Sequence, residues 1–168
     1  MDAVRNVGFV DAIKLGFAKY ANFRGRAQRS EYWWWILFYL IASVAAVILD
    51  LLAGTDNITN SASELEATGL FELLVSLALL IPTFAVTSRR LHDIDRSGWW
   101  QLLPLVAFVA FVLTPVAPTL AVILAFGGFL ALTIVLIVWL VRDSDRGPNR
   151  FGPSPKYQGI VADDTVSI

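Results

Sequence analysis

The sequence predicts an all-α integral membrane protein in which an amphipathic helix precedes a bundle of four transmembrane helices. The first observation is composition: 57% of the 168 residues are hydrophobic and 16% are charged, whereas soluble domains have about half and about a quarter. The second is that apolar stretches about as long as a bilayer is thick recur along the chain. The third is that basic residues are absent from two of the three segments that join these stretches.

An amphipathic helix is expected over residues 7–20. Val10, Ile13, Phe17 and Tyr20 follow one another at intervals of three or four residues, and charged residues occupy other positions. The segment is too short and too charged to span a bilayer. Two placements remain open for it: on the membrane surface, or in the cytoplasm against the end of the bundle.

The first span is expected at residues 32–53, which as a helix would cover about 33 Å. Tyr32 and three tryptophans open it, and such rings prefer the headgroup level. Ser30 is expected to cap it, with Glu31 complementing the positive helix end. Asp50 lies in its last turn, where we expect the carboxylate to reach water at the far interface.

The second span is expected at residues 69–88, after a capping box formed by Ser63 and Glu66. Glu72 lies near its outer end, within reach of water. Pro82 lies inside it and should kink the helix. Because proline has no N–H group, neighbouring helices must satisfy the carbonyl that it frees.

Residues 99–141 contain no charged side chain. As one helix they would be about 65 Å long, which is twice the hydrocarbon thickness. The chain must therefore fold back, and the only strong breaker is the segment 114–119, with two prolines. Two further spans are expected, at residues 99–115 and 119–141.

The basic residues predict the topology. Six precede the first span, three lie between the second and third, and four follow the fourth, which accounts for all 13. Four spans keep every basic residue on the cytoplasmic side, as the positive-inside bias requires, whereas three would export four of them. We therefore expect cytoplasmic termini, a single membrane domain over residues 1–156 and a disordered tail over residues 157–168.

Three segments on the expected cytoplasmic side carry motifs: residues 23–33 (FRGRAQRSEYW), 89–100 (RRLHDIDRSGWW) and 147–153 (GPNRFGP). At these residues the sequence resembles the bacterial inner-membrane family catalogued as domain of unknown function 805, over roughly residues 14–156. The sequence departs from the family pattern at Asp95, where glycine is usual, and at Phe151, where tyrosine is common. The first departure weakens the expectation of a tight turn there. The resemblance implies a location in the cell inner membrane and no established activity.

His92 is the only histidine and is followed by Asp93. A histidine beside a carboxylate can act as a base, a proton relay or a pH sensor. The alternative is structural, because Arg90, Asp93 and Arg96 have the i, i+3 spacing of a helical salt-bridge ladder. One histidine without cysteine does not make a usual zinc site, so no catalytic residue, metal ligand or cofactor is assigned.

The cytoplasmic side yields one candidate functional cluster. Its members are Arg24, Arg26, Arg29, Arg89, Arg90, His92, Asp93, Arg96, Asn149 and Arg150. The arginines either bind anionic headgroups, at about 1 kcal/mol per residue near an anionic leaflet, or serve only as topology signals and as ion-pair partners of nearby acids. A nucleic-acid partner is not expected, because acids balance these basic residues and no net basic field remains.

The sequence thus predicts an inner-membrane scaffold or interaction protein without enzymatic activity. Its cytoplasmic cap, built from the amphipathic helix, the 89–98 loop and the 147–153 segment, would contact lipid headgroups or an unknown membrane protein, and the chain can form a homo-oligomer. The alternatives are a small transporter or channel subunit, which needs a polar pathway at the midplane, and a membrane enzyme that uses His92 and Asp93 on a lipid-linked substrate.

Overall fold

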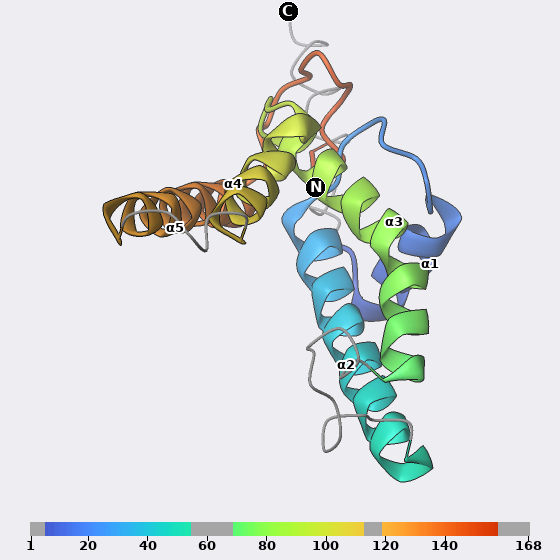
Figure 1. Ribbon diagram of the computed structural model, residues 1–168. Helices are drawn as coiled ribbons and strands as arrows, with labels where there is room; N and C mark the ends of the chain where they lie inside the picture. The colour runs from blue at the N-terminus through green and yellow to red at the C-terminus, as the bar shows by residue number, and fades with distance from the viewer. Residues whose placement is uncertain (1–5, 55–68, 113–118, 158–168) are drawn as a thin grey trace, which may run out of the picture. The chain divides into compact units, whose positions relative to one another are not determined.

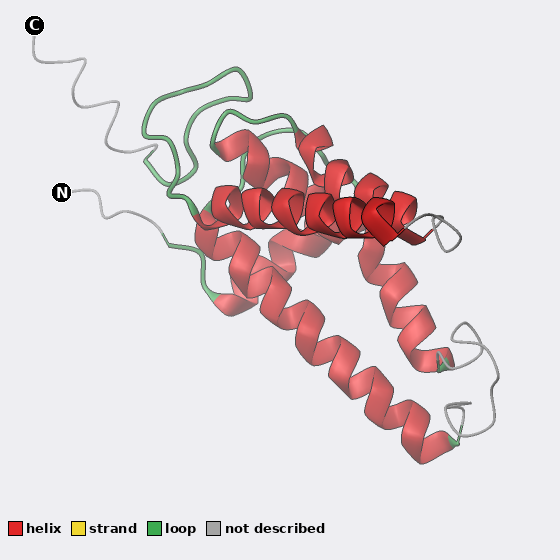
Figure 2. Ribbon diagram, turned by 60° about the vertical axis from the view of Figure 1, so that its left-hand side comes forward, coloured by secondary structure: helices red, strands yellow, loops and turns green. Residues whose placement is uncertain are grey.

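The computed structural model describes residues 6–54, 69–112 and 119–157. Within these ranges it contains helices and loops and no β-strand (Figures 1 and 2), which confirms the all-α class. The elements are α1 (Phe9–Ala18), α2 (Arg29–Ala53), α3 (Leu70–Asp93), the 3₁₀-helix η1 (Gly98–Gln101), α4 (Leu102–Val112) and α5 (Thr119–Val141). Three described helices, α2, α3 and α5, are long and apolar enough to cross a membrane, and Gly98–Phe111 is a shorter apolar helix.

The helix bounds agree with the sequence in part. The fourth expected span coincides with α5. In contrast, α2 begins at Arg29, so Ser30 lies inside its first turn and the predicted N-cap is wrong; the Ser30 Oγ instead accepts a hydrogen bond of 3.2 Å from the Val7 N–H. The expected capping box at 63–66 and most of the breaker at 114–119 lie outside the described residues.

The chain divides into two compact units, and the boundaries fall near the start of α2 and within α3. The first unit comprises residues 7–22 and 30–85, and therefore α1, nearly all of α2 and most of α3. The second comprises residues 23–29 and the described chain from residue 86 onward, and therefore the end of α3, η1, α4, α5 and the segment after α5.

In the first unit α2 and α3 lie side by side and antiparallel (Figure 1). Trp35 of α2 is fully buried and donates from Nε1 to the Thr83 Oγ1 of α3 over 3.1 Å. α1 packs on the flank of α2, where Phe17 makes an edge contact with Trp35 at 5.6 Å between ring centroids. Gly16 lies against the same ring, and a Cβ at this position would overlap it.

Pro82 is buried inside α3, where it cannot donate a backbone hydrogen bond. The carbonyl that loses its donor is that of Ala78, four residues earlier. The Tyr20 hydroxyl, just beyond α1, donates a hydrogen bond to the Ala78 oxygen. The sequence predicts that a neighbouring helix satisfies this carbonyl; the donor is a side chain two residues beyond the end of α1.

Asp50 does not reach water, and the expectation that it would is wrong. Its side chain is almost completely buried, and its two oxygens accept hydrogen bonds from the Phe71 N–H (2.9 Å) and the Glu72 N–H (2.8 Å). The carboxylate thereby satisfies free N–H groups in the first turn of α3 and faces the positive end of the helix dipole. Gly69 is required beside it, because a Cβ there would overlap the carboxylate.

In the second unit α4 and α5 form an antiparallel hairpin (Figure 1). Aromatic pairs set its register, with Trp100 against Trp139, Phe108 against Phe129 and Phe111 against Phe126 at centroid distances of 5.2, 5.7 and 5.6 Å. The remaining surface of the hairpin is apolar and largely exposed.

Candidate functional site

The site is built at the C-terminal end of α3. The Asp95 and Arg96 N–H groups donate back to the carbonyls of His92 and Leu91 (3.1 and 2.9 Å), which is the Schellman pattern that ends a helix. Its left-handed position is occupied by Asp95, at φ 55°, where glycine would be free of strain. The tight turn is therefore present despite the departure from glycine, and residues 89–93, expected in a loop, are helical.

Asp93, in the last turn of α3, is the centre of a buried ion cluster. Its Oδ1 lies 3.0 Å from Arg26 Nε and its Oδ2 lies 2.6 Å from Arg90 Nη1, and all three side chains are at most 1% exposed. Two cations on one carboxylate leave the buried cluster with a net positive charge. Such a cluster holds together only if other groups satisfy the remaining N–H donors.

Arg26 has all five of its N–H donors satisfied. Besides Asp93 Oδ1, its guanidinium donates to the backbone oxygens of Asp93 (3.0 Å), Asp145 (2.7 Å), Gly147 (2.8 Å) and Gly152 (3.2 Å). Arg26 therefore binds the end of α3 and three carbonyls of the segment that follows α5. A planar fork of five donors is specific to arginine, and lysine offers three donors from one point.

Arg90 joins the same cluster to the end of α5. Its Nε donates to the Leu140 oxygen over 3.2 Å, and its Nη2 donates to the Arg142 oxygen. These carbonyls belong to the last turn of α5 and the residue after it, where carbonyls lack helical partners and a cation is favoured. Arg29 approaches the neighbouring Val141 oxygen at 3.5 Å.

His92 lies on another face of α3 from Asp93. Its Nδ1 is 3.1 Å from the Gly25 oxygen; a carbonyl only accepts, so Nδ1 carries the proton. Its ring stacks on that of Phe151 at 3.8 Å with an interplanar angle of 4°, and its backbone oxygen accepts from Asn149 Nδ2 (2.8 Å). His92 therefore helps to dock the 149–152 turn.

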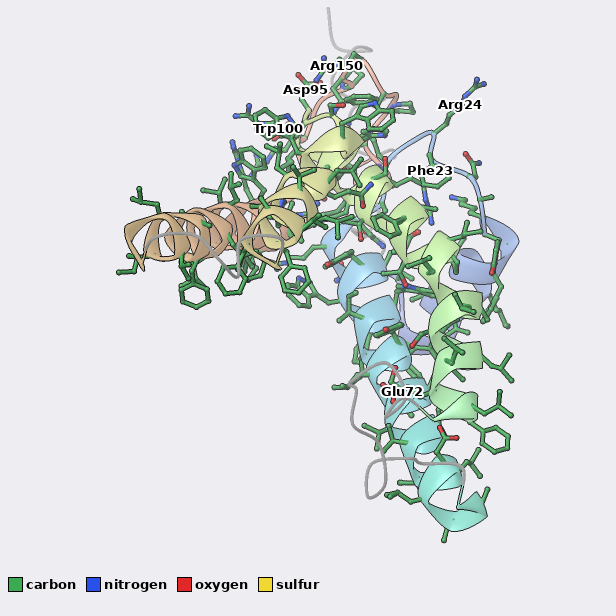
Figure 3. The ribbon with its side chains drawn as sticks, viewed as in Figure 1. Phe23, Arg24, Glu72, Asp95, Trp100 and Arg150 are labelled. Atoms are coloured by element: carbon green, nitrogen blue, oxygen red, sulfur yellow. The ribbon has the colours of Figure 1, made fainter. Side chains whose placement is uncertain are left out.

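The predicted Arg90–Asp93–Arg96 ladder is half correct. The Arg90–Asp93 pair is present, but the helix ends before Arg96, whose guanidinium lies over the ring of Trp139 at 4.9 Å from the centroid. Asp95 pairs instead with Arg150 at 3.1 Å in an exposed contact; Figure 3 labels both residues. Surface pairs of this kind contribute about 0–1 kcal/mol.

The nine arginines that the structure describes in the second unit fall into two sets. Arg26, Arg89 and Arg90 are buried. The others are exposed: Arg24, Arg29, Arg96, Arg142, Arg146 and Arg150. Between residues 23–29 and 86–157 ten basic residues face four acids, a formal net charge of +6. The whole chain has a formal net charge of -1, so positive charge is concentrated in these two stretches.

An ion pair closes a loop within the segment after α5. Lys156 Nζ donates to both oxygens of Asp143, at 2.7 and 2.8 Å. The hydrogen bond from Lys156 holds the pKa of Asp143 below its ordinary value, and the same bond holds the pKa of Lys156 above its ordinary value. The described residues bring together no group of three or more His, Asp or Glu side chains that could hold a metal ion.

The structure thus brings together Arg26, Arg90, His92, Asp93, Asn149 and Arg150 of the predicted cluster, and separates Arg96 from the ladder. The sequence analysis gave Tyr20 no hydrogen-bonding role and did not single out Gly25 or Trp139. A signal existed only for Tyr20, since Pro82 requires a hydrogen-bond donor near Ala78. Four of the five acceptors of Arg26 are backbone carbonyls, up to 126 residues away in the sequence. No side-chain motif predicts contacts with backbone carbonyls.

These features define a helical membrane protein in which buried arginines join the end of α3 to the end of α5 and to the segment that follows it, while six further arginines are exposed. The chain belongs to the family described as protein of unknown function DUF805, which matches residues 20–153. It is 32% identical over 139 residues to the inner membrane protein YhaH of Escherichia coli, covering 83% of this chain and 91% of that protein. It is also 32% identical over 138 residues to the inner membrane protein YhaI of Escherichia coli, covering 82% and 89%.

No solved structure matches the chain. With relatives that are inner membrane proteins and helices long and apolar enough to span a bilayer, the chain is an integral inner-membrane protein.

Proposed function

We propose that the chain crosses the inner membrane four times with both termini in the cytoplasm, and that it is a non-enzymatic interaction protein whose cytoplasmic cap contacts anionic lipid headgroups. The cap is defined as residues 23–29, 89–98 and 142–157. It omits α1, because α1 belongs to the first unit.

The topology is supported by contacts inside the second unit. Arg26, which precedes α2, contacts the end of α3 at Asp93 and the segment after α5 at Gly147, and Arg90 of α3 contacts the end of α5 at Leu140. A chain that leaves the end of α3 and returns to it after α4 and α5 has crossed the bilayer an even number of times. The short helix formed by η1 and α4 is then a span of about 25 Å, which slight thinning of the bilayer accommodates.

The observation that carries the headgroup proposal is the division of the arginines. Asp93 and backbone carbonyls satisfy Arg26 and Arg90 in the interior, whereas six arginines are exposed within residues 23–29 and 86–157, whose formal net charge is +6. Near an anionic leaflet each exposed basic residue contributes about 1 kcal/mol. Positive charge exposed beside apolar helices attracts the negatively charged phosphate of a lipid, whereas it would not attract a neutral surface.

The enzymatic alternative is less well supported by the same contacts. Two arginines occupy the Asp93 carboxylate, so it does not orient or activate His92 as a catalytic acid would. The transport alternative requires polar groups free at the midplane, but Thr83 bonds Trp35 and Thr133 bonds the Phe129 carbonyl of its own helix.

The topology is tested by labelling single cysteines in a chain that has none. Asn60→Cys and Ala117→Cys should react with a membrane-impermeant maleimide in intact cells. The matched control Arg146→Cys should react only after permeabilisation. Labelling of Arg146→Cys in intact cells would overturn the proposal of cytoplasmic termini.

The lipid contact is tested by thermal unfolding of the purified protein in dodecyl maltoside. Phosphatidylglycerol should raise the melting temperature and phosphatidylcholine should not, and the difference should shrink in 1 M salt, where the Debye length falls to about 3 Å. Equal effects of the two lipids would overturn the headgroup proposal and leave a protein partner as the target of the cap.

A further inference from the structure

Two exposed arginines lie over aromatic rings: Arg150 over Phe151, at 4.8 Å from the centroid, and Arg96 over Trp139. Since Arg150 also pairs with Asp95, the arginine available to a ligand is Arg96. Its backbone N–H closes the turn after α3, and its guanidinium lies over Trp139 of α5. Trp139 in turn receives the edge of Trp100 at an interplanar angle of 88°. Among the described residues no carboxylate pairs with Arg96, because Asp95 beside it pairs with Arg150.

Stacking leaves the binding groups of arginine available. A guanidinium that lies on a ring face keeps its N–H donors in its own plane, and two of them match the spacing of two phosphate oxygens. The ring also restricts the side chain before any ligand arrives, which lowers the entropy lost on binding.

The position of this stack suits a lipid phosphate. Trp100 opens the apolar hairpin and Trp139 lies in its last turn, so the indoles mark one end of the apolar stretch, and Trp99 beside them is 75% exposed. Tryptophan prefers the headgroup level of a bilayer. A guanidinium on top of Trp139 therefore lies at the depth where phosphodiester groups are found.

We propose that Arg96, stacked on Trp139, is a specific binding site for the phosphate of an anionic glycerophospholipid. The proposal rests on the proposed headgroup contact and deepens it, since it replaces a diffuse basic surface with one defined subsite. Arg96 supplies two parallel N–H···O hydrogen bonds, and Trp99 and Trp100 border the glycerol and upper acyl region.

The experiment titrates phosphatidylglycerol into the detergent-solubilised full chain and measures retained lipid by native mass spectrometry. Arg96→Gln and Arg96→Lys should each weaken binding by about tenfold or more, the effect of losing a charge-assisted hydrogen bond. Lysine keeps the charge but not the planar fork. The matched control Arg146→Gln removes the same charge from an exposed arginine with no ring contact and should change binding by less than about threefold.

Each outcome separates the two proposals. Equal effects of Arg96→Gln and Arg146→Gln, with wild-type affinity in Arg96→Lys, would overturn the subsite and leave the diffuse headgroup contact standing. Absence of any phosphatidylglycerol preference in the wild type would overturn both. If inorganic phosphate alone stabilises the wild type as much as the lipid does, and Arg96→Gln abolishes this, the site takes a free anion and the lipid assignment is wrong. Melting temperatures without lipid should be unchanged in all three variants, which verifies folding.

Discussion

Replacing Arg26 tests whether this one buried side chain holds the cap together. Arg26→Gln removes the charge and most of the five hydrogen bonds that join Asp93 to the backbone oxygens of Asp145, Gly147 and Gly152. Breaking a buried ion pair by removing one partner costs about 3–5 kcal/mol. We take the lower end, about 3 kcal/mol, because Arg90 still neutralises Asp93.

The loss should appear as local opening of the segment after α5. A change of about 3 kcal/mol raises the population of the open state by roughly two orders of magnitude. Good reporters are the amides of Asn149, Phe151 and Gly152, which are hydrogen-bonded within their turn. Hydrogen exchange measured by mass spectrometry should therefore accelerate about 100-fold in peptides that cover this turn, up to the intrinsic rate.

Arg150→Gln is the matched control. It removes an arginine from the same segment, but its pair with Asp95 is more than half exposed, so the loss should be about 0–1 kcal/mol and the acceleration less than about fivefold. Arg26→Lys should resemble Arg26→Gln more than the wild type, since three donors from a single point cannot reach five acceptors. Equal protection in Arg26→Gln and Arg150→Gln would refute the assignment of Arg26 as the residue that holds the cap.

Three further predictions concern single contacts. Tyr20→Phe should lower the free energy of unfolding in detergent by about 1–3 kcal/mol, because the Ala78 carbonyl loses its hydrogen-bond donor. The same substitution should have little effect in a Pro82→Ala background, where residue 82 supplies the helical N–H. An undiminished effect there would show that the hydroxyl serves another role. Asp95→Gly should be neutral or stabilising, because relief of the left-handed strain, about 1 kcal/mol, offsets the lost surface pair, whereas Asp95→Ala keeps the strain and should lower the melting temperature. The Asp143–Lys156 contact should be pH-dependent at both ends. Because the pKa of Asp143 is lowered in the folded state, its contribution to stability is complete above the usual carboxyl range near pH 4 and is lost as pH falls through the folded-state pKa. Because the pKa of Lys156 is raised, its contribution to stability is complete below about pH 10 and is lost as pH rises through the folded-state pKa. Backbone chemical shifts around Lys156 should follow this profile, and Lys156→Gln should abolish it.

Local patterns predicted the helices because their causes are local. The bounds of α5 follow from an uncharged apolar run that ends at Arg142. The donor required at Ala78 follows from the missing N–H of Pro82. The error at Ser30 is also local in kind: serine is a good N-cap, but a contact with Val7 occupies its hydroxyl and the helix begins before it.

The cluster could be predicted only in its membership. The expectation that Arg26, Arg90 and Asp93 belong to one group follows from the positive-inside bias and from motif spacing. Their geometry does not follow, because Arg26 and Asp93 are 67 residues apart and the other acceptors of Arg26 are carbonyls, which every residue possesses. The ladder failed at Arg96 because helical spacing has no meaning beyond the turn that ends α3.

The sequence by itself determined that the chain is helical and that it is apolar enough for the bilayer, since hydropathy is summed residue by residue. Only the tertiary structure decided which arginines are buried and which are exposed, that Asp50 caps α3 instead of facing water, and that His92 and Asp93 contact different partners. These outcomes depend on which distant segments meet, and the desolvation cost of a buried charge can be met only where several such segments supply partners at once.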